Sequence, residues 1–131
     1  MRGQVLGMRG QAASVSVVAR GPEPRRFLER PDLFGGRGRD EPLEWHEASD
    51  LKSELAAAYF QHLVAYQLKR ALEDAGHTVE TIARKTGVTA ETIRRKLRGE
   101  ERASLEDILG WALEYGIDLL PIFESRDDLL P

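Results

Sequence analysis

The chain has 131 residues, 41% of them hydrophobic, with 12 Gly, 6 Pro, no Cys and a formal net charge of −3. This length suits one modest domain and is too short for a barrel enzyme or a doubly wound enzyme with a separate substrate domain. The absence of cysteine excludes disulfides, iron–sulfur clusters, thiolate zinc sites and a cysteine nucleophile. No apolar run approaches the roughly 20 residues of a membrane span. No signal-peptide pattern opens the chain, so we expect a soluble cytoplasmic protein with no membrane partner.

The charge is segregated along the chain. Residues 1–39 carry eight Arg and three acids, a sum of +5, and residues 83–98 carry six basic residues against Glu91 alone, also +5. Residues 99–131 carry nine acids and two Arg, a sum of −7. Because these blocks cancel only in the total, the mild net charge does not argue against a nucleic-acid partner.

Composition separates an N-terminal part from the rest. Seven of the 12 Gly and four of the 6 Pro lie before residue 45. We therefore predict an Arg/Gly/Pro-rich arm over residues 1–47. Its one ordered candidate is the alternating segment 14–18, a short strand that needs a partner, such as the same strand of a second subunit.

The second half of the chain is predicted to be helical. After Ser49 or Asp50 as N-cap, no Gly or Pro intervenes before Gly76, which allows a helix of up to about 26 residues. Three shorter helices follow, over 79–85, 90–97 or 98, and 105–115, with caps Thr78, Thr89 and Ser104 and terminating glycines Gly87, Gly99 and Gly116. Residues 117–121 leave the last helix as extended chain, and residues 122–131 form an acidic tail.

The fold class we predict is therefore all-α, with a compact helical bundle over residues 48–121. The apolar positions expected to share its core are Leu68, Leu72, Ile82, Ala83, Val88, Ile93, Leu97, Leu105, Ile108, Leu109, Ala112 and Leu113, with Trp111 at the edge.

The two short helices within residues 78–98 have the spacing of a helix-turn-helix. Ala83 is small where the two helices cross, and Gly87, four residues on, can take the left-handed backbone that a short turn requires. Val88 follows as an apolar residue, and Ile93 anchors the second helix in the core.

At these residues the sequence resembles the Cro and phage-repressor-like family of helix-turn-helix regulators, the XRE family, from about Tyr66 to Leu119. The stretches that carry the resemblance are LKRAL at 68–72, TVETIARKTGV at 78–88, TIRRKLRG at 92–99, SLEDIL at 104–109 and GIDL at 116–119. One departure is Lys96, which stands where the family has an apolar residue, and we expect Leu97 to supply that contact.

The resemblance implies a lambda-repressor-like fold in which residues 90–98 lie in the major groove of double-stranded DNA. Expected base contacts are Thr89, Ala90, Glu91, Arg94 and Arg95, the two arginines being suited to guanine. Expected phosphate contacts are Thr78, Thr81, Arg84 and Arg98. The implied protein is a nucleoid-associated transcriptional regulator, a repressor that binds a two-fold operator as a homodimer.

Two other function classes differ in how far the residues support them. His46, His62 and His77 are 16 and 15 residues apart and have no metal-ligand spacing, so we expect no metal, no cofactor and no catalytic residue. An antitoxin-like interaction factor remains open, in which the helix-turn-helix is secondary and residues 1–63 bind a protein partner. Packing of Val15–Val18 and Trp45 on residues 51–63 would assign the arm to the fold or to a dimer rather than to such a partner.

Overall fold

The computed structural model of the protein describes residues 23–46 and 51–124. Two short 3-10 helices come first, η1 (Pro24–Phe27) and η2 (Pro31–Leu33), and the α-helices that follow are α2 (Lys52–Ala75), α3 (Val79–Thr86), α4 (Ala90–Leu97), α5 (Leu105–Tyr115) and α6 (Leu120–Glu124). The described residues contain no strand and only one isolated antiparallel bridge, between Leu28 and Trp45. The all-α prediction is confirmed, and the expected strand at 14–18 lies outside the described residues.

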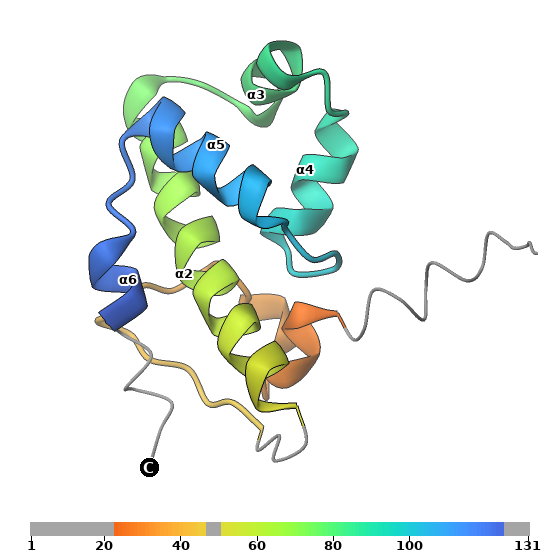
Figure 1. The fold of residues 1–131 in the computed structure, drawn as a ribbon, viewed down its shortest axis with the longest axis vertical. Coiled ribbons are helices and arrows are strands. Elements are labelled where there is room, and N and C mark those ends of the chain that lie inside the picture. The colour runs from red at the N-terminus through yellow and green to blue at the C-terminus, as the bar shows by residue number, and fades with distance from the viewer. Residues whose placement is uncertain (1–22, 47–50, 125–131) are drawn as a thin grey trace, which may run out of the picture.

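Helix α2 is the axis around which the other elements pack. It runs along the long dimension of the molecule, with α5 across it and the pair α3 and α4 to one side (Figure 1). The helix lasts 24 residues because neither Gly nor Pro interrupts it, and it ends at Gly76, whose left-handed φ is +70°. Its N-cap is Leu51, so the helix begins slightly later than expected, and Ser49 and Asp50 lie outside the described residues.

Residues 23–46, hereafter the N-terminal segment, belong to the core of the helical domain. Leu28 is 1% exposed and Phe34 is 3% exposed, and both lie in one cluster with the buried residues of α2. The Trp45 ring contacts Tyr59 and His62 of α2 edge-on, at centroid distances of 5.4 and 5.5 Å. The expected division into an arm at 1–47 and a domain from 48 is therefore corrected for residues 23–46, while residues 1–22 lie outside the described part. Composition suggested a loose arm, but its large apolar side chains gain free energy by covering one side of α2.

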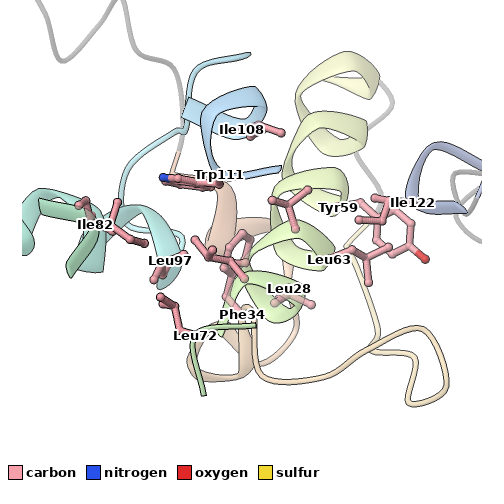
Figure 2. Packing of buried hydrophobic residues seen from close by; sticks show 14 residues of the cluster. Leu28, Phe34, Tyr59, Leu63, Leu72, Ile82, Leu97, Ile108, Trp111 and Ile122 are labelled. Atoms are coloured by element: carbon pink, nitrogen blue, oxygen red, sulfur yellow. The ribbon is translucent and has the colours of Figure 1, made fainter. Parts of the chain in front are cut away.

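The core contains most of the predicted positions. Leu68, Leu72, Ile82, Ile93, Leu97, Ile108 and Ala112 are all buried, and Ala83 and Val88 pack against them partly buried. Figure 2 shows Leu72, Ile82 and Leu97 in the same cluster as Trp111 and Phe34. Side chains from every α-helix of the described chain thus share one core.

The prediction of which face of α5 is buried is wrong in part. Leu105, Leu109 and Leu113 are exposed by 65%, 45% and 86%, whereas Trp111, expected at the edge, is only 5% exposed. Apolar residues surround most of this helix, so periodicity alone leaves its rotation undetermined. The row that contains Ile108 and Trp111 faces α2 because burying the large indole removes more apolar surface from water than burying a leucine.

The expected acidic tail at 122–131 is also corrected. Residues 120–124 form α6, and Ile122 within it is 4% exposed in the core. The Phe123 ring lies 4.6 Å from that of Phe60 on α2. Extended chain is confined to residues 117–119, because the apolar side chains beyond them pack back on α2, and residues 125–131 lie outside the described part.

Candidate nucleic-acid interface

Helices α3 and α4 are joined by a tight turn of residues 87–89. Gly87 takes a left-handed φ of +77°, and its N–H donates to the carbonyl of Ala83 at 2.9 Å. At the start of α3 the Thr81 hydroxyl accepts a hydrogen bond from the Thr78 N–H at 3.2 Å. Gly87 thus supplies the left-handed conformation that so short a turn requires, and α3 is capped at both ends.

Helix α4 is anchored on one side and open on the other. Ile93 and Leu97, one turn apart, are 2% and 4% exposed, and the Thr89 hydroxyl caps the helix by accepting from the Thr92 N–H at 3.3 Å. Because α-helical periodicity places positions three and four apart on one face, the polar residues lie on the other side. The side chains presented there are Glu91, Arg94, Arg95 and Arg98.

The C-terminal end of α4 is attached to α2 and α5 by polar contacts. Gln61 of α2 is 3% exposed, and its amide donates to the carbonyls of Lys96 and Glu101 at 2.8 and 3.0 Å while accepting from the Ala103 N–H at 2.9 Å. Lys96 extends to Asp107 of α5, at 2.7 Å between Nζ and Oδ2. Lys96 thus has a charged partner in the fold, and the buried Leu97 makes the apolar contact that Lys96 does not.

The N-terminal segment contacts the end of α4 directly. A Cβ added at Gly99 would lie 2.6 Å from the Phe34 ring, and Gly99 itself has a left-handed φ of +76°. The Arg25 N–H donates to the Gly99 carbonyl at 3.0 Å. The position of α4 therefore depends on residues far from it in sequence.

Arg94 is paired across the two helices. Its Nη2 donates to Oε2 of Glu80 on α3 in a short ion pair. The pKa of the Glu80 carboxyl is lowered by a hydrogen bond from its own backbone and by the Arg94 guanidinium. Arg94 therefore has a carboxylate partner in the free protein.

Arg95 and Arg98 form a second network with three carboxylates. Oε2 of Glu91 lies 3.8 Å from Arg95 Nη1 and 3.3 Å from Arg98 Nη2. Arg95 Nε also reaches Glu101 at 3.4 Å, and Arg98 Nε reaches Glu100 at 2.6 Å. The Glu100 carboxylate raises the pKa of Arg98, and the guanidinium lowers the pKa of Glu100. The network links Arg95, which is expected to contact DNA bases, to Arg98, which is expected to contact phosphates.

The surroundings of residues 83–98 are therefore less positive in the folded protein than the sequence sum suggests. The +5 of residues 83–98 is offset by carboxylates brought in from Glu80, Glu100, Glu101 and Asp107. Arg84 of α3 is exposed and makes no ion pair within the described part of the chain. Of the basic residues expected at DNA, Arg84 is the one that has no ion pair among the described residues.

The fold brings the expected contact residues together in two groups. Thr89, Ala90, Glu91, Arg94, Arg95 and Arg98 belong to α4 or its caps, and Thr78, Thr81 and Arg84 belong to α3 or its cap. The hydroxyls of Thr81 and Thr89 serve as hydrogen-bond acceptors within their own helices. The arginines Arg94 and Arg95 point to different partners and do not form one uniform basic patch.

Sequence reasoning missed the partners of the arginines. The Glu91–Arg95 pair has the i, i+4 spacing of a helical ion pair and was readable from the sequence. Glu80 is 14 residues from Arg94, and Gln61 is 35 residues from Lys96. No local signal identifies either contact, because tertiary packing alone brings these residues together.

Among the described residues no group of three or more His, Cys, Asp or Glu is placed to hold a metal ion. A cleft of about 490 Å³ lies between α5 and the pair α3 and α4, with the Lys85–Glu114 ion pair in its lining. An apolar groove of about 380 Å³ lies between α2, α5 and α6. Within residues 23–46 and 51–124, no helix has the length and apolar character needed to cross a membrane.

Comparison with known proteins assigns the chain to no family. No protein family matches the chain, and neither a curated protein nor a solved structure does so.

Proposed function

We propose that the protein is a sequence-specific double-stranded-DNA-binding regulator, a transcriptional repressor of the XRE type, and not an enzyme. The observation that carries this proposal is the construction of α4. Ile93, Leu97 and the contacts of Gln61 fix one side and end of the helix. The opposite side presents Glu91, Arg94 and Arg95 to an incoming partner.

The proposed roles follow from side-chain chemistry. Arg94 and Arg95 bind guanine bidentately in the major groove, with Thr89, Ala90 and Glu91 at neighbouring base edges. Arg84, Arg98, Thr78 and Thr81 bind phosphates and set the position of α4 in the groove. Because Arg84 has no carboxylate partner in the described structure, we expect it to contribute most of the sequence-independent affinity.

The proposed regulator is a homodimer on a two-fold operator and acts at the nucleoid in the cytoplasm. Dimers of this kind place their two recognition helices about one turn of DNA apart. The exposed leucines of α5, Leu105, Leu109 and Leu113, offer an apolar surface of the type that protein contacts cover. We propose a second copy of the chain as their partner.

Selection from random DNA duplexes, followed by gel-shift titrations over a salt series, tests the proposal. The wild type should select one sequence and bind it more weakly as salt rises. The double variant Arg94→Ala, Arg95→Ala should lose the preference, since one bidentate contact gives about 1–3 kcal/mol of discrimination.

A matched control separates base contacts from loss of charge. The double variant Arg30→Ala, Arg37→Ala removes the same charge from the N-terminal segment, where these residues ion-pair with Asp32 and Glu41. It should keep the selected sequence. Binding without sequence preference by the wild type, or selection of the same site by the Arg94, Arg95 variant, would refute the proposal.

The alternative is an antitoxin-like factor whose residues 1–63 bind a protein. It loses support because Trp45 packs on Tyr59 and His62 and because Leu28 and Phe34 are buried. Residues 23–46 are therefore occupied by the protein's own core, while Val15–Val18 lie outside the described residues.

A further inference from the structure

The ion pair between Glu80 and Arg94 suggests how the proposed DNA site would separate specific from nonspecific binding. Glu80 lies in the first turn of α3 and Arg94 in the last turn of α4, so the pair spans the two helices. Both side chains are partly open to solvent, with exposed fractions of 51% and 40%. Neither helix needs this pair to fold, since each is capped and anchored by other residues.

Only one nitrogen of Arg94 is occupied by Glu80. The bond uses Nη2, and no other hydrogen bond within the described structure uses Nε or Nη1. A guanidinium has five N–H donors in a fixed fork, so Arg94 retains donors that can reach acceptors on a base edge.

A carboxylate partner affects phosphate and base contacts differently. Nonspecific affinity comes from cationic side chains that neutralise phosphates and release counterions. An arginine already neutralised by a carboxylate releases fewer counterions. Contacts to guanine O6 and N7 are directed hydrogen bonds to uncharged acceptors, and the remaining donors of Arg94 can still make them.

We propose that Glu80 is a specificity-determining residue, which suppresses binding of Arg94 to phosphates while leaving its donors available for a base. This inference rests on the DNA-binding function proposed above. Glu80 thereby favours the operator over other DNA by weakening the competing complexes.

The test compares Glu80→Gln with wild type on the selected operator and on a scrambled duplex over a salt series. The amide has the same shape but no charge, so Arg94 becomes available to phosphates. We expect scrambled-DNA affinity to rise roughly 8-fold at 0.1 M salt, with the log–log salt slope steeper by about 0.9, the effect of one added phosphate contact. Operator affinity should rise less, so the specificity ratio falls.

Two controls make the result specific to this pair. Glu41→Gln makes the same charge change in the N-terminal segment, where Glu41 lies 3.9 Å from Arg37, and it should leave the specificity ratio unchanged. Combining Glu80→Gln with Arg94→Ala should remove the gain on scrambled DNA. Circular dichroism should show that all variants melt like the wild type.

The outcomes distinguish this inference from the function on which it rests. If the wild type selects no sequence, the DNA-binding proposal fails, and the role of Glu80 fails with it. If the wild type selects an operator but Glu80→Gln leaves the salt slope and the specificity ratio unchanged, only the role of Glu80 is refuted. A variant that loses operator affinity without gaining affinity for scrambled DNA refutes it equally, since Glu80 would then only position Arg94.

Discussion

The backbone N–H of Gly35 donates a hydrogen bond to Nδ1 of His62 at 2.7 Å, in a contact buried from solvent. The geometry places the histidine proton on Nε2, because Nδ1 must accept. The contact joins the N-terminal segment to the middle of α2, where His62 also meets the rings of Phe34 and Trp45. A protonated His62 has no acceptor to offer Gly35.

We therefore predict that the protein loses stability between about pH 6.5 and pH 4. Burial and the nearby charge of Lys69 lower the pKa of His62 from 6.5 to about 4. In this range the unfolded chain binds a proton that the folded chain excludes, so stability falls as pH falls. The loss should reach about 3 kcal/mol, measured by urea denaturation at a series of pH values.

The histidine variants check this assignment. His62→Gln should flatten the pH dependence in that range, because its amide oxygen can accept from Gly35 and does not titrate. His77→Gln changes an exposed histidine beside Tyr115 and should leave the dependence as in wild type. A wild-type slope that persists in His62→Gln would assign the loss to other groups.

A second prediction concerns the contact between Gly99 and Phe34. Gly99→Ala should destabilise the protein by about 2–4 kcal/mol, the sum of left-handed strain and overpacking against the ring. Gly116 is the matched control, because its φ is +68° but an added Cβ would meet nothing within 4 Å. Gly116→Ala should cost about 1–2 kcal/mol. If thermal or urea unfolding gives the same loss of stability for both variants, the contact with the Phe34 ring adds no cost at residue 99.

The third prediction concerns Gln61, which bridges α2 to the end of α4. Gln61→Leu should cost about 2–3 kcal/mol, because it leaves buried backbone groups such as the Ala103 N–H without a partner. Gln67→Leu on the exposed side of the same helix should change stability by less than about 0.5 kcal/mol. If the two variants unfold at the same urea concentration, Gln61 does not stabilise the fold.

The fourth prediction tests the rotation of α5. In protein dilute enough to be monomeric, Ile108→Ala should cost about 2–5 kcal/mol as a buried large-to-small change, whereas Leu113→Ala should cost less than about 0.5 kcal/mol. Guanidinium unfolding of both variants measures the difference. A Leu113→Ala cost equal to that of Ile108→Ala would place Leu113 in the core and contradict the structure.

The fifth prediction tests the proposed dimer. Leu109→Glu combined with Leu113→Glu should convert a dimer to a monomer in light scattering while the fold remains intact. If the wild type is a monomer at high micromolar concentration, the two-fold operator is refuted. If the double variant stays dimeric, the contact involves another face.

The short helices could be predicted because their signals are local. Thr78, Thr89 and Ser104 cap them, and Gly87 and Gly116 end them in left-handed backbone, so each helix is bounded by residues within one turn of its ends. The same local pattern placed Arg94 and Arg95 at the surface of α4, since Ile93 and Leu97 face the core and the two arginines stay partly exposed. The partners of those arginines were not predictable, because Glu80 and Glu101 approach through tertiary packing.

Propensity, capping and periodicity act over a few residues, so the chain alone predicts that its second half is helical and which residues the α3–α4 pair contains. Three other features appear only in the folded chain: residues 23–46 complete the core, α5 turns Trp111 inward and Leu113 outward, and carboxylates from outside α4 pair with its basic residues. All three have the same cause. Burial of apolar area and pairing of charges depend on which surfaces meet, and many sequence-distant surfaces satisfy the same local pattern.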